Sequence, residues 1–140
     1  MPELLGYTDI LKKRYFNLKK LTEKPTLIHF WSVSCPDCKK RFPQITKLAE
    51  EYDQLIHVIS IHMPRTKEDR EIDRVQDIAD EFQLMNPILI DNQYKLTNAF
   101  GTKYVPSYFL FDENMKLRHY QSNGSIRMLR RRIDRLVKEK

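Results

Sequence analysis

The segment that decides the fold runs from residue 26 to residue 42 and reads TLIHFWSVSCPDCKKRF. Its first six residues, 26–31, form a short apolar run rich in strand formers, which is typical of a strand buried on both faces of a sheet. Directly after Cys35 the spacing becomes helical, and the apolar residues on one face are Phe42, Ile45, Leu48, Ala49 and Tyr52. The sequence therefore predicts a buried strand followed at once by a helix, with Cys35 and Cys38 at the junction.

The rest of the chain alternates between the same two patterns. We expect further strands at 55–61, 87–91, 107–111 and 115–120, and helices at 66–82, at 92–100 and from 126 to the C-terminus. Residues 1–25 are mixed, with an extended stretch expected at 15–18. Strands that alternate with helices imply parallel units, and the last two strands add an antiparallel edge. The predicted fold is α/β, a central mixed β-sheet flanked by helices, in a single domain spanning residues 1–140.

The bulk composition limits the function classes. At 140 residues and 41% hydrophobic composition the chain suits one soluble domain. No stretch approaches the ~18 unbroken apolar residues of a membrane span. The N-terminus lacks a basic start followed by an apolar core, so we expect no secretory leader and a cytoplasmic location. Two cysteines are too few for a disulfide scaffold, and in a reducing compartment a close pair is more often catalytic or metal-binding.

The spacing of the two cysteines predicts thiol chemistry. At a helix N-terminus, free N–H groups and the helix dipole favour thiolate over thiol, so we expect Cys35 to be the nucleophile. Cys38 lies one turn later and faces inward, which suits a thiol that resolves a mixed disulfide. Structural zinc would need two more ligands, and the four histidines form no second close pair, so we expect no metal and no cofactor.

The C-terminal segment accounts for much of the net charge of +6. Its apolar residues at helical spacing are Ile126, Leu129, Ile133, Leu136 and Val137, and its basic residues are Arg127, Arg130, Arg131, Arg132, Arg135, Lys138 and Lys140. We interpret it as an amphipathic helix with a solvated basic face. Recruitment of an acidic protein stays an alternative, whereas the lack of interleaved aromatic residues argues against nucleic acid.

The run FWSVSCPDCKKRFP at residues 30–43 resembles the active-site signature of bacterial thioredoxin-like thiol-disulfide oxidoreductases of the redoxin branch. The similarity extends from about residue 15 to the C-terminus and includes IHMPR at 61–65 and VPS at 105–107. It is closest to small leaderless cytosolic members, although better-known members are membrane-tethered and serve cytochrome c maturation. The resemblance implies a thioredoxin fold, with a helix-strand insertion at about 68–90 in the middle of the core.

The same resemblance implies roles for further residues. Pro106 is expected to be cis and to lie beside the cysteines, where the Val105 backbone can pair with an extended substrate. Trp31 is expected beneath the cysteine loop, and Pro36 joins it among the substrate-binding residues. His29 replaces a buried acid of related thioredoxins, so it is a candidate proton shuttle or a core residue.

One position departs from the membrane-tethered relatives. Arg41 stands where they carry a glutamate three residues after the second cysteine, which argues against a role in cytochrome c maturation.

The resulting hypothesis is a monomeric enzyme that reduces protein disulfides in the cytosol through Cys35 and Cys38. Its expected partners are disulfide-containing protein substrates and an upstream dithiol reductant, with neither nucleic acid nor membrane. Two alternatives remain open. The spacing of Ser32 and Cys35 partly resembles the loop of a thiol peroxidase, and a thioredoxin-like binding module could use the cysteines only to tune an interaction.

Overall fold

Within the residues that the computed structural model describes (8–9, 14–15, 23–84 and 86–139), seven strands form one sheet in the order β2-β1-β5-β4-β3-β6-β7. The strands are β1 (Thr8–Asp9), β2 (Arg14–Tyr15), β3 (Thr26–Trp31), β4 (His57–His62), β5 (Ile88–Ile90), β6 (Ser107–Phe111) and β7 (Leu117–Ser122). β3, β4 and β5 pair in parallel, whereas β6 pairs antiparallel with β3, and β7 pairs antiparallel with β6. The predicted mixed sheet with an antiparallel edge is confirmed.

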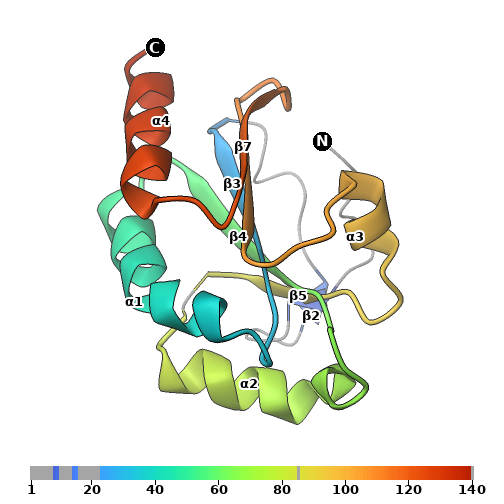
Figure 1. Cartoon of the computed structure of the whole chain (residues 1–140). Coiled ribbons are helices and arrows are strands. Elements are labelled where there is room, and N and C mark those ends of the chain that lie inside the picture. Colours follow the sequence, from blue (N-terminus) through green and yellow to red (C-terminus); the bar gives the residue numbers. More distant parts are fainter. Residues whose placement is uncertain (1–7, 10–13, 16–22, 85, 140) are drawn as a thin grey trace.

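The helices cover both faces of this sheet (Figure 1). They are α1 (Pro36–Glu51), α2 (Ile72–Glu81), α3 (Lys95–Phe100) and α4 (Ile126–Lys138), with a short 3-10 helix, η2 (Glu68–Arg70), before α2. α1 and α4 lie side by side on one face, and α3 lies on the other. α2 lies across the end of the molecule at which β3 finishes, so it borders the cysteine loop.

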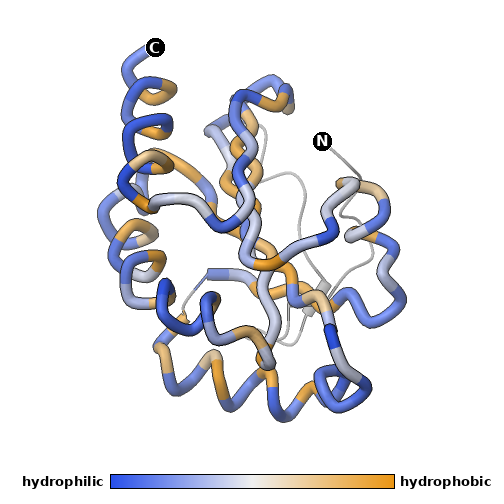
Figure 2. Tube along the Cα trace, viewed as in Figure 1, coloured by the Kyte–Doolittle hydropathy of each residue, from blue (hydrophilic) through white to orange (hydrophobic). Residues whose placement is uncertain are grey.

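Alternation along β3 divides the core between the two faces. Leu27 packs with apolar residues of α1 and α4, whereas Ile28 and Phe30 pack with Leu96 of α3 on the opposite face. The hydropathy colouring shows apolar residues recurring between hydrophilic ones along the helices (Figure 2). A third cluster, which contains both cysteines and Trp31, joins the start of α1 to α2.

The predicted helix over 66–82 is divided in two by the structure. Glu71 is extended (φ −74°, ψ 112°) between η2 and α2, so the two helical segments are separate. The predicted helix over 92–100 begins only at Lys95, because the Asp91 carboxylate accepts hydrogen bonds from the N–H groups of Leu96 and Thr97 (3.0 and 2.7 Å). Of the extended stretch expected at 15–18, residues 16–18 lie outside the described residues.

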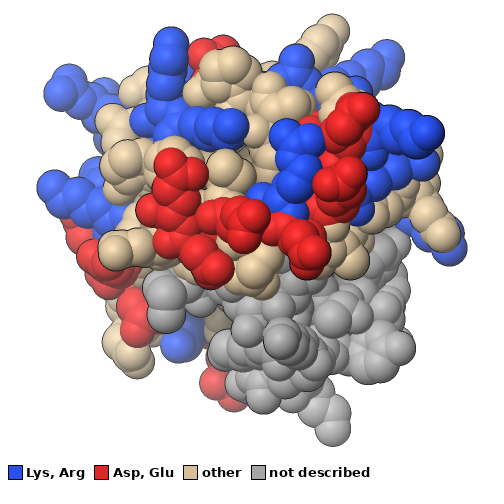
Figure 3. Space-filling model, turned by 90° about the horizontal axis from the view of Figure 1, so that it is seen from below, with Lys and Arg blue, Asp and Glu red and all other residues tan. Residues whose placement is uncertain are grey.

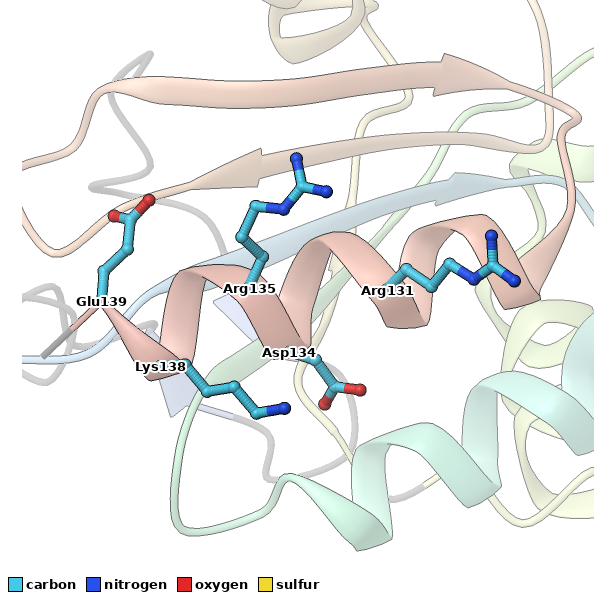
Figure 4. A pocket seen from close by; sticks show the side chains of 5 residues that line it. All are labelled: Arg131, Asp134, Arg135, Lys138 and Glu139. Atoms are coloured by element: carbon cyan, nitrogen blue, oxygen red, sulfur yellow. The ribbon is translucent and has the colours of Figure 1, made fainter.

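α4 is amphipathic, as predicted. Its buried side is formed by Ile126, Leu129, Ile133 and Leu136. Its outer side carries the basic residues and a shallow hollow (Figure 4), which is lined by Arg131, Asp134, Arg135, Lys138 and Glu139. α2 has the opposite charge, and its exposed acidic residues are Asp73, Asp77, Asp80 and Glu81. Viewed from below, acidic side chains form a band across this end of the molecule (Figure 3).

Candidate active site

Cys35 is the N-cap of α1, so its side chain lies where the first helical N–H groups have no partner within the helix. Its Sγ accepts a hydrogen bond from the Cys38 N–H (3.1 Å). Pro36 occupies the first turn, where the missing N–H costs nothing. This arrangement stabilises negative charge on the Cys35 sulfur.

Cys35 and Cys38 are joined by a disulfide, and their Cα atoms are 5.3 Å apart. Cys35 keeps a narrow exposed edge (2%), whereas Cys38 has none (0%). Pro36 and Asp37 between them are exposed, so the loop lies at the surface while the second sulfur faces the core. A partner can therefore reach the pair only from the side of Cys35.

The Val105–Pro106 bond is cis, as the resemblance implied. The Val105 carbonyl oxygen lies 3.8 Å from Cys35 Sγ, so this loop borders the reactive sulfur. The Asn123 N–H donates a hydrogen bond to the Pro106 carbonyl (2.8 Å). Arg41 in turn donates two hydrogen bonds to Asn123 Oδ1, from Nε (3.2 Å) and Nη2 (2.9 Å). Arg41 thus connects α1 to the cis-proline loop, a role that sequence reasoning missed.

Trp31 is fully buried beneath the cysteine loop. Its ring packs edge-on against Phe42 and His62, with centroids 5.1 and 5.0 Å apart. The ring packs in one cluster with both cysteines, but it has no exposed surface, so it can affect a substrate only through the residues above it.

His29 is also fully buried. Its ring stacks on Tyr108 (5.1 Å between centroids, 7° between planes), and Nδ1 lies 3.3 Å from Ser60 Oγ. Nε2 has no hydrogen-bond partner among the described residues. Burial lowers the pKa of His29 to about 3, so the imidazole is neutral at neutral pH. Such a weak base is poorly matched to proton transfer at that pH, although the role stays a prediction.

The connection between β4 and α2, residues 62–70, also belongs to the site, and sequence reasoning did not place it there. His62, at the end of β4, accepts the Val33 N–H at Nε2 (3.2 Å), and burial lowers the pKa of His62 to about 4. Asp69 in η2 accepts the Ser34 hydroxyl (2.6 Å). The sequence signals in this segment were the helix expected from residue 66 and the resemblance at 61–65, and neither indicated a contact with the cysteine loop.

The redoxin family model matches residues 9–134, which is most of the chain. The chain belongs to the redoxin family. This redoxin is 39% identical over 140 residues to the thiol-disulfide oxidoreductase YkuV of Bacillus subtilis, covering 99% of this chain and 95% of the relative. It is 26% identical to the thiol-disulfide oxidoreductase ResA of Halalkalibacterium halodurans, covering 91% of this chain and 70% of ResA.

A solved structure gives the same result for the fold. The solution structure of a thioredoxin-like protein in the oxidised form matches this redoxin with a TM-score of 0.87 and 38% identity, covering 100% of this chain and 95% of the other. The expected family, fold and enzyme class, a thioredoxin-like thiol-disulfide oxidoreductase, are thereby confirmed. Over the described part of the redoxin, no helix has both the length and the apolar character to cross a membrane.

Proposed function

We propose that this redoxin reduces disulfides of protein substrates in the cytoplasm, as a monomer, with Cys35 as nucleophile and Cys38 as resolving thiol. The observation that carries the proposal is the position of Cys35 Sγ at the N-terminus of α1, where it accepts the Cys38 N–H. The same helix buries the Cys38 sulfur completely. The two thiols therefore differ in access and in charge stabilisation, as a two-step exchange requires.

In the first step the Cys35 thiolate attacks one sulfur of the substrate disulfide. A bond forms between Cys35 and the substrate, the substrate S–S bond breaks, and the second substrate sulfur leaves as a thiolate that takes a proton from solvent. An extended substrate segment is supported by the backbone at Val105 and Pro106, which borders the Cys35 sulfur. The exposed Pro36 lies at the edge of the same surface.

In the second step Cys38, once deprotonated, attacks Cys35 in the mixed disulfide. The bond between Cys35 and the substrate breaks, the substrate sulfur leaves as a thiolate that takes a proton from solvent, and the Cys35–Cys38 disulfide forms. Two electrons have then passed to the substrate, and an upstream dithiol must return them to the enzyme. The short separation of the cysteines in α1 makes this step intramolecular, which favours it over escape of the mixed disulfide.

The peroxidase alternative receives less support from the site. Its argument depends on Ser32 near Cys35, but the Ser32 hydroxyl donates a hydrogen bond to the Met63 carbonyl. Ser32 is fully buried and serves the packing of the loop. The binding-module alternative predicts that partners are retained without either thiol, so the same cysteine variants test it.

The experiment compares Cys35→Ser, Cys38→Ser and a control variant, Ser122→Ala, whose side chain is exposed at the end of β7. With a disulfide-linked fluorescent peptide as substrate, we expect Cys35→Ser to lose turnover and to trap nothing. Cys38→Ser should lose turnover but accumulate mixed disulfides on Cys35, and Ser122→Ala should match the wild type. Peptide turnover by Cys35→Ser, or faster consumption of hydrogen peroxide than of peptide, would refute the proposal.

The direction of catalysis has its own test. Equilibration of the Cys35–Cys38 couple against dithiothreitol buffers should give a reduction potential near that of thioredoxin, roughly −270 mV. A potential near roughly −120 mV would instead indicate an oxidant and would contradict the reductase role.

A further inference from the structure

The three residues that lead into Cys35 are each hydrogen-bonded to the β4–α2 connection, residues 62–70. The bonds join Ser32 to the Met63 carbonyl, the Val33 N–H to His62 Nε2 (3.2 Å) and the Ser34 hydroxyl to Asp69 Oδ2 (2.6 Å). Each of the three residues before the nucleophile is therefore fixed to a segment about 30 positions away in the sequence. Such a constraint limits the orientations that the Cys35 sulfur can adopt.

Asp69 is the one carboxylate among these anchors, and it is 1% exposed. Besides the Ser34 hydroxyl, its Oδ2 accepts the N–H groups of Arg65 (2.9 Å) and Thr66 (3.2 Å). Burial opposes ionisation, yet the hydrogen bonds from Ser34, Arg65 and Thr66 together hold the pKa of Asp69 below its usual value. A buried negative charge therefore lies one hydrogen bond away from the residue that precedes Cys35.

A helix cap explains only part of this arrangement. Thr66 and Asp69 do form reciprocal cap contacts, since the Asp69 N–H donates to Thr66 Oγ1 (3.3 Å). However, η2 has three residues, and a cap needs neither burial nor a bond to another segment. The Ser34 bond spans 35 positions and is the shortest that Asp69 makes, and Arg65 Nη1 also donates to the Ser34 carbonyl (3.4 Å).

We propose that Asp69 is a positioning residue for disulfide exchange, which fixes the approach to Cys35 through Ser34 and whose charge limits the stability of the Cys35 thiolate. The inference rests on the proposed role of Cys35 as nucleophile. Both effects act on the same step. The hydrogen bond holds the sulfur in its attacking position. The negative charge raises the pKa of the Cys35 thiol, and a thiolate of higher pKa is more nucleophilic.

The charge effect follows from what surrounds the cysteine. The helix N-terminus stabilises the thiolate, as does Lys39 of α1, while Asp37 of α1 and Asp69 of η2 oppose it. The exposed Asp37 is screened by water, whereas Asp69 is buried and screened much less. The guanidinium of Arg65 is exposed, and His62 is neutral because burial lowers its pKa to about 4. Glu68, the other carboxylate of the β4–α2 connection, is exposed, so Asp69 is the one buried opposing charge there.

The test separates charge from position with Asp69→Asn and Ser34→Ala. The asparagine oxygen can still accept the bonds from Ser34, Arg65 and Thr66, but it carries no charge. We therefore expect the pH midpoint of Cys35 alkylation to fall by about 0.5 to 1. The reduction potential should become less negative, and the alkylation rate at the high-pH plateau should fall by about two- to threefold, because a thiolate of lower pKa is less nucleophilic.

Ser34→Ala keeps the charge and removes the bond. Its midpoint should stay close to that of the wild type, while the plateau rate of peptide-disulfide reduction falls by about fivefold. Ser34→Thr, which keeps the hydroxyl, should restore that rate. Asp77→Asn, an exposed carboxylate on α2, serves as the control and should change neither quantity.

An unchanged midpoint in folded Asp69→Asn would refute the charge effect, and equal plateau rates for Ser34→Ala and the wild type would refute positioning. Mapping of the alkylated thiol by mass spectrometry keeps the two proposals apart. Alkylation at Cys38 in the wild type would contradict the proposed function itself, whatever Asp69 does.

Discussion

His29 lies in the middle of β3 with no exposed surface, stacked on Tyr108 and edge-on to Phe42. The residue type alone allowed two roles, because a histidine can transfer protons near neutral pH or simply fill a core. The surroundings support the core role, and proton transfer stays a prediction. Desolvation lowers the pKa of His29 to about 3. This shift could not be predicted from a sequence pattern, because the burial of the ring depends on residues of three other segments. The cysteine pair, by contrast, was predictable because its chemistry is set within one helix turn.

We expect His29→Phe to resolve mixed disulfides within about twofold of the wild-type rate, because an imidazole of such low basicity contributes little as a proton acceptor. The phenyl ring can keep the stacking on Tyr108 and removes the unpartnered Nε2, so the free energy of unfolding should fall by no more than about 1 kcal/mol. His29→Ala, which leaves a cavity, should lose about 2–4 kcal/mol. Stopped-flow fluorescence and urea denaturation measure the two quantities. A tenfold slower resolution in folded His29→Phe would establish proton transfer.

Among the helices and strands, those set by local sequence patterns were predicted correctly, whereas those shaped by distant contacts were not. β3 begins and ends at the predicted residues, since its apolar run and the following N-cap are both local. The predicted helix over 66–82 was wrong in its first half, where Glu71 is extended between η2 and α2. Asp69 is held in η2 by Ser34, a contact that the periodicity of the helix cannot show. The link from Arg41 to Asn123 spans 82 positions and was equally invisible.

Arg41→Met tests the connection between α1 and the cis-proline loop. The methionine keeps the apolar stem of the side chain but cannot donate to Asn123, whose own N–H holds the Pro106 carbonyl. We expect the free energy of unfolding to fall by about 0.5 to 1 kcal/mol and the KM for a peptide disulfide to rise more than kcat falls. The control is Arg132→Met on α4, an exposed arginine. If both variants behave alike, the connection contributes nothing.

At the scale of the whole molecule, the site is assembled from the end of β3, the start of α1, the β4–α2 connection and the cis-proline loop. Sequence patterns located the first two parts, and the family resemblance supplied the cis-proline loop. The β4–α2 connection was found only in three dimensions. The same assembly buries two histidines of the sheet, one in β3 and one at the end of β4. His29 and His62 are both fully buried, and burial lowers the pKa of each, to about 3 and about 4.

These two histidines should make stability depend on pH. In the unfolded chain each titrates near 6.5, so below that pH the unfolded state binds more protons than the folded state, and the free energy of unfolding falls as pH falls. The slope approaches about 1.4 kcal/mol per pH unit for each histidine between its unfolded and folded pKa values. Urea denaturation of the oxidised protein between pH 7 and pH 5.5, above the range of most carboxylates, measures it. His29→Phe should remove about half of the slope. A flat profile in the wild type would mean that neither imidazole is buried in its neutral form.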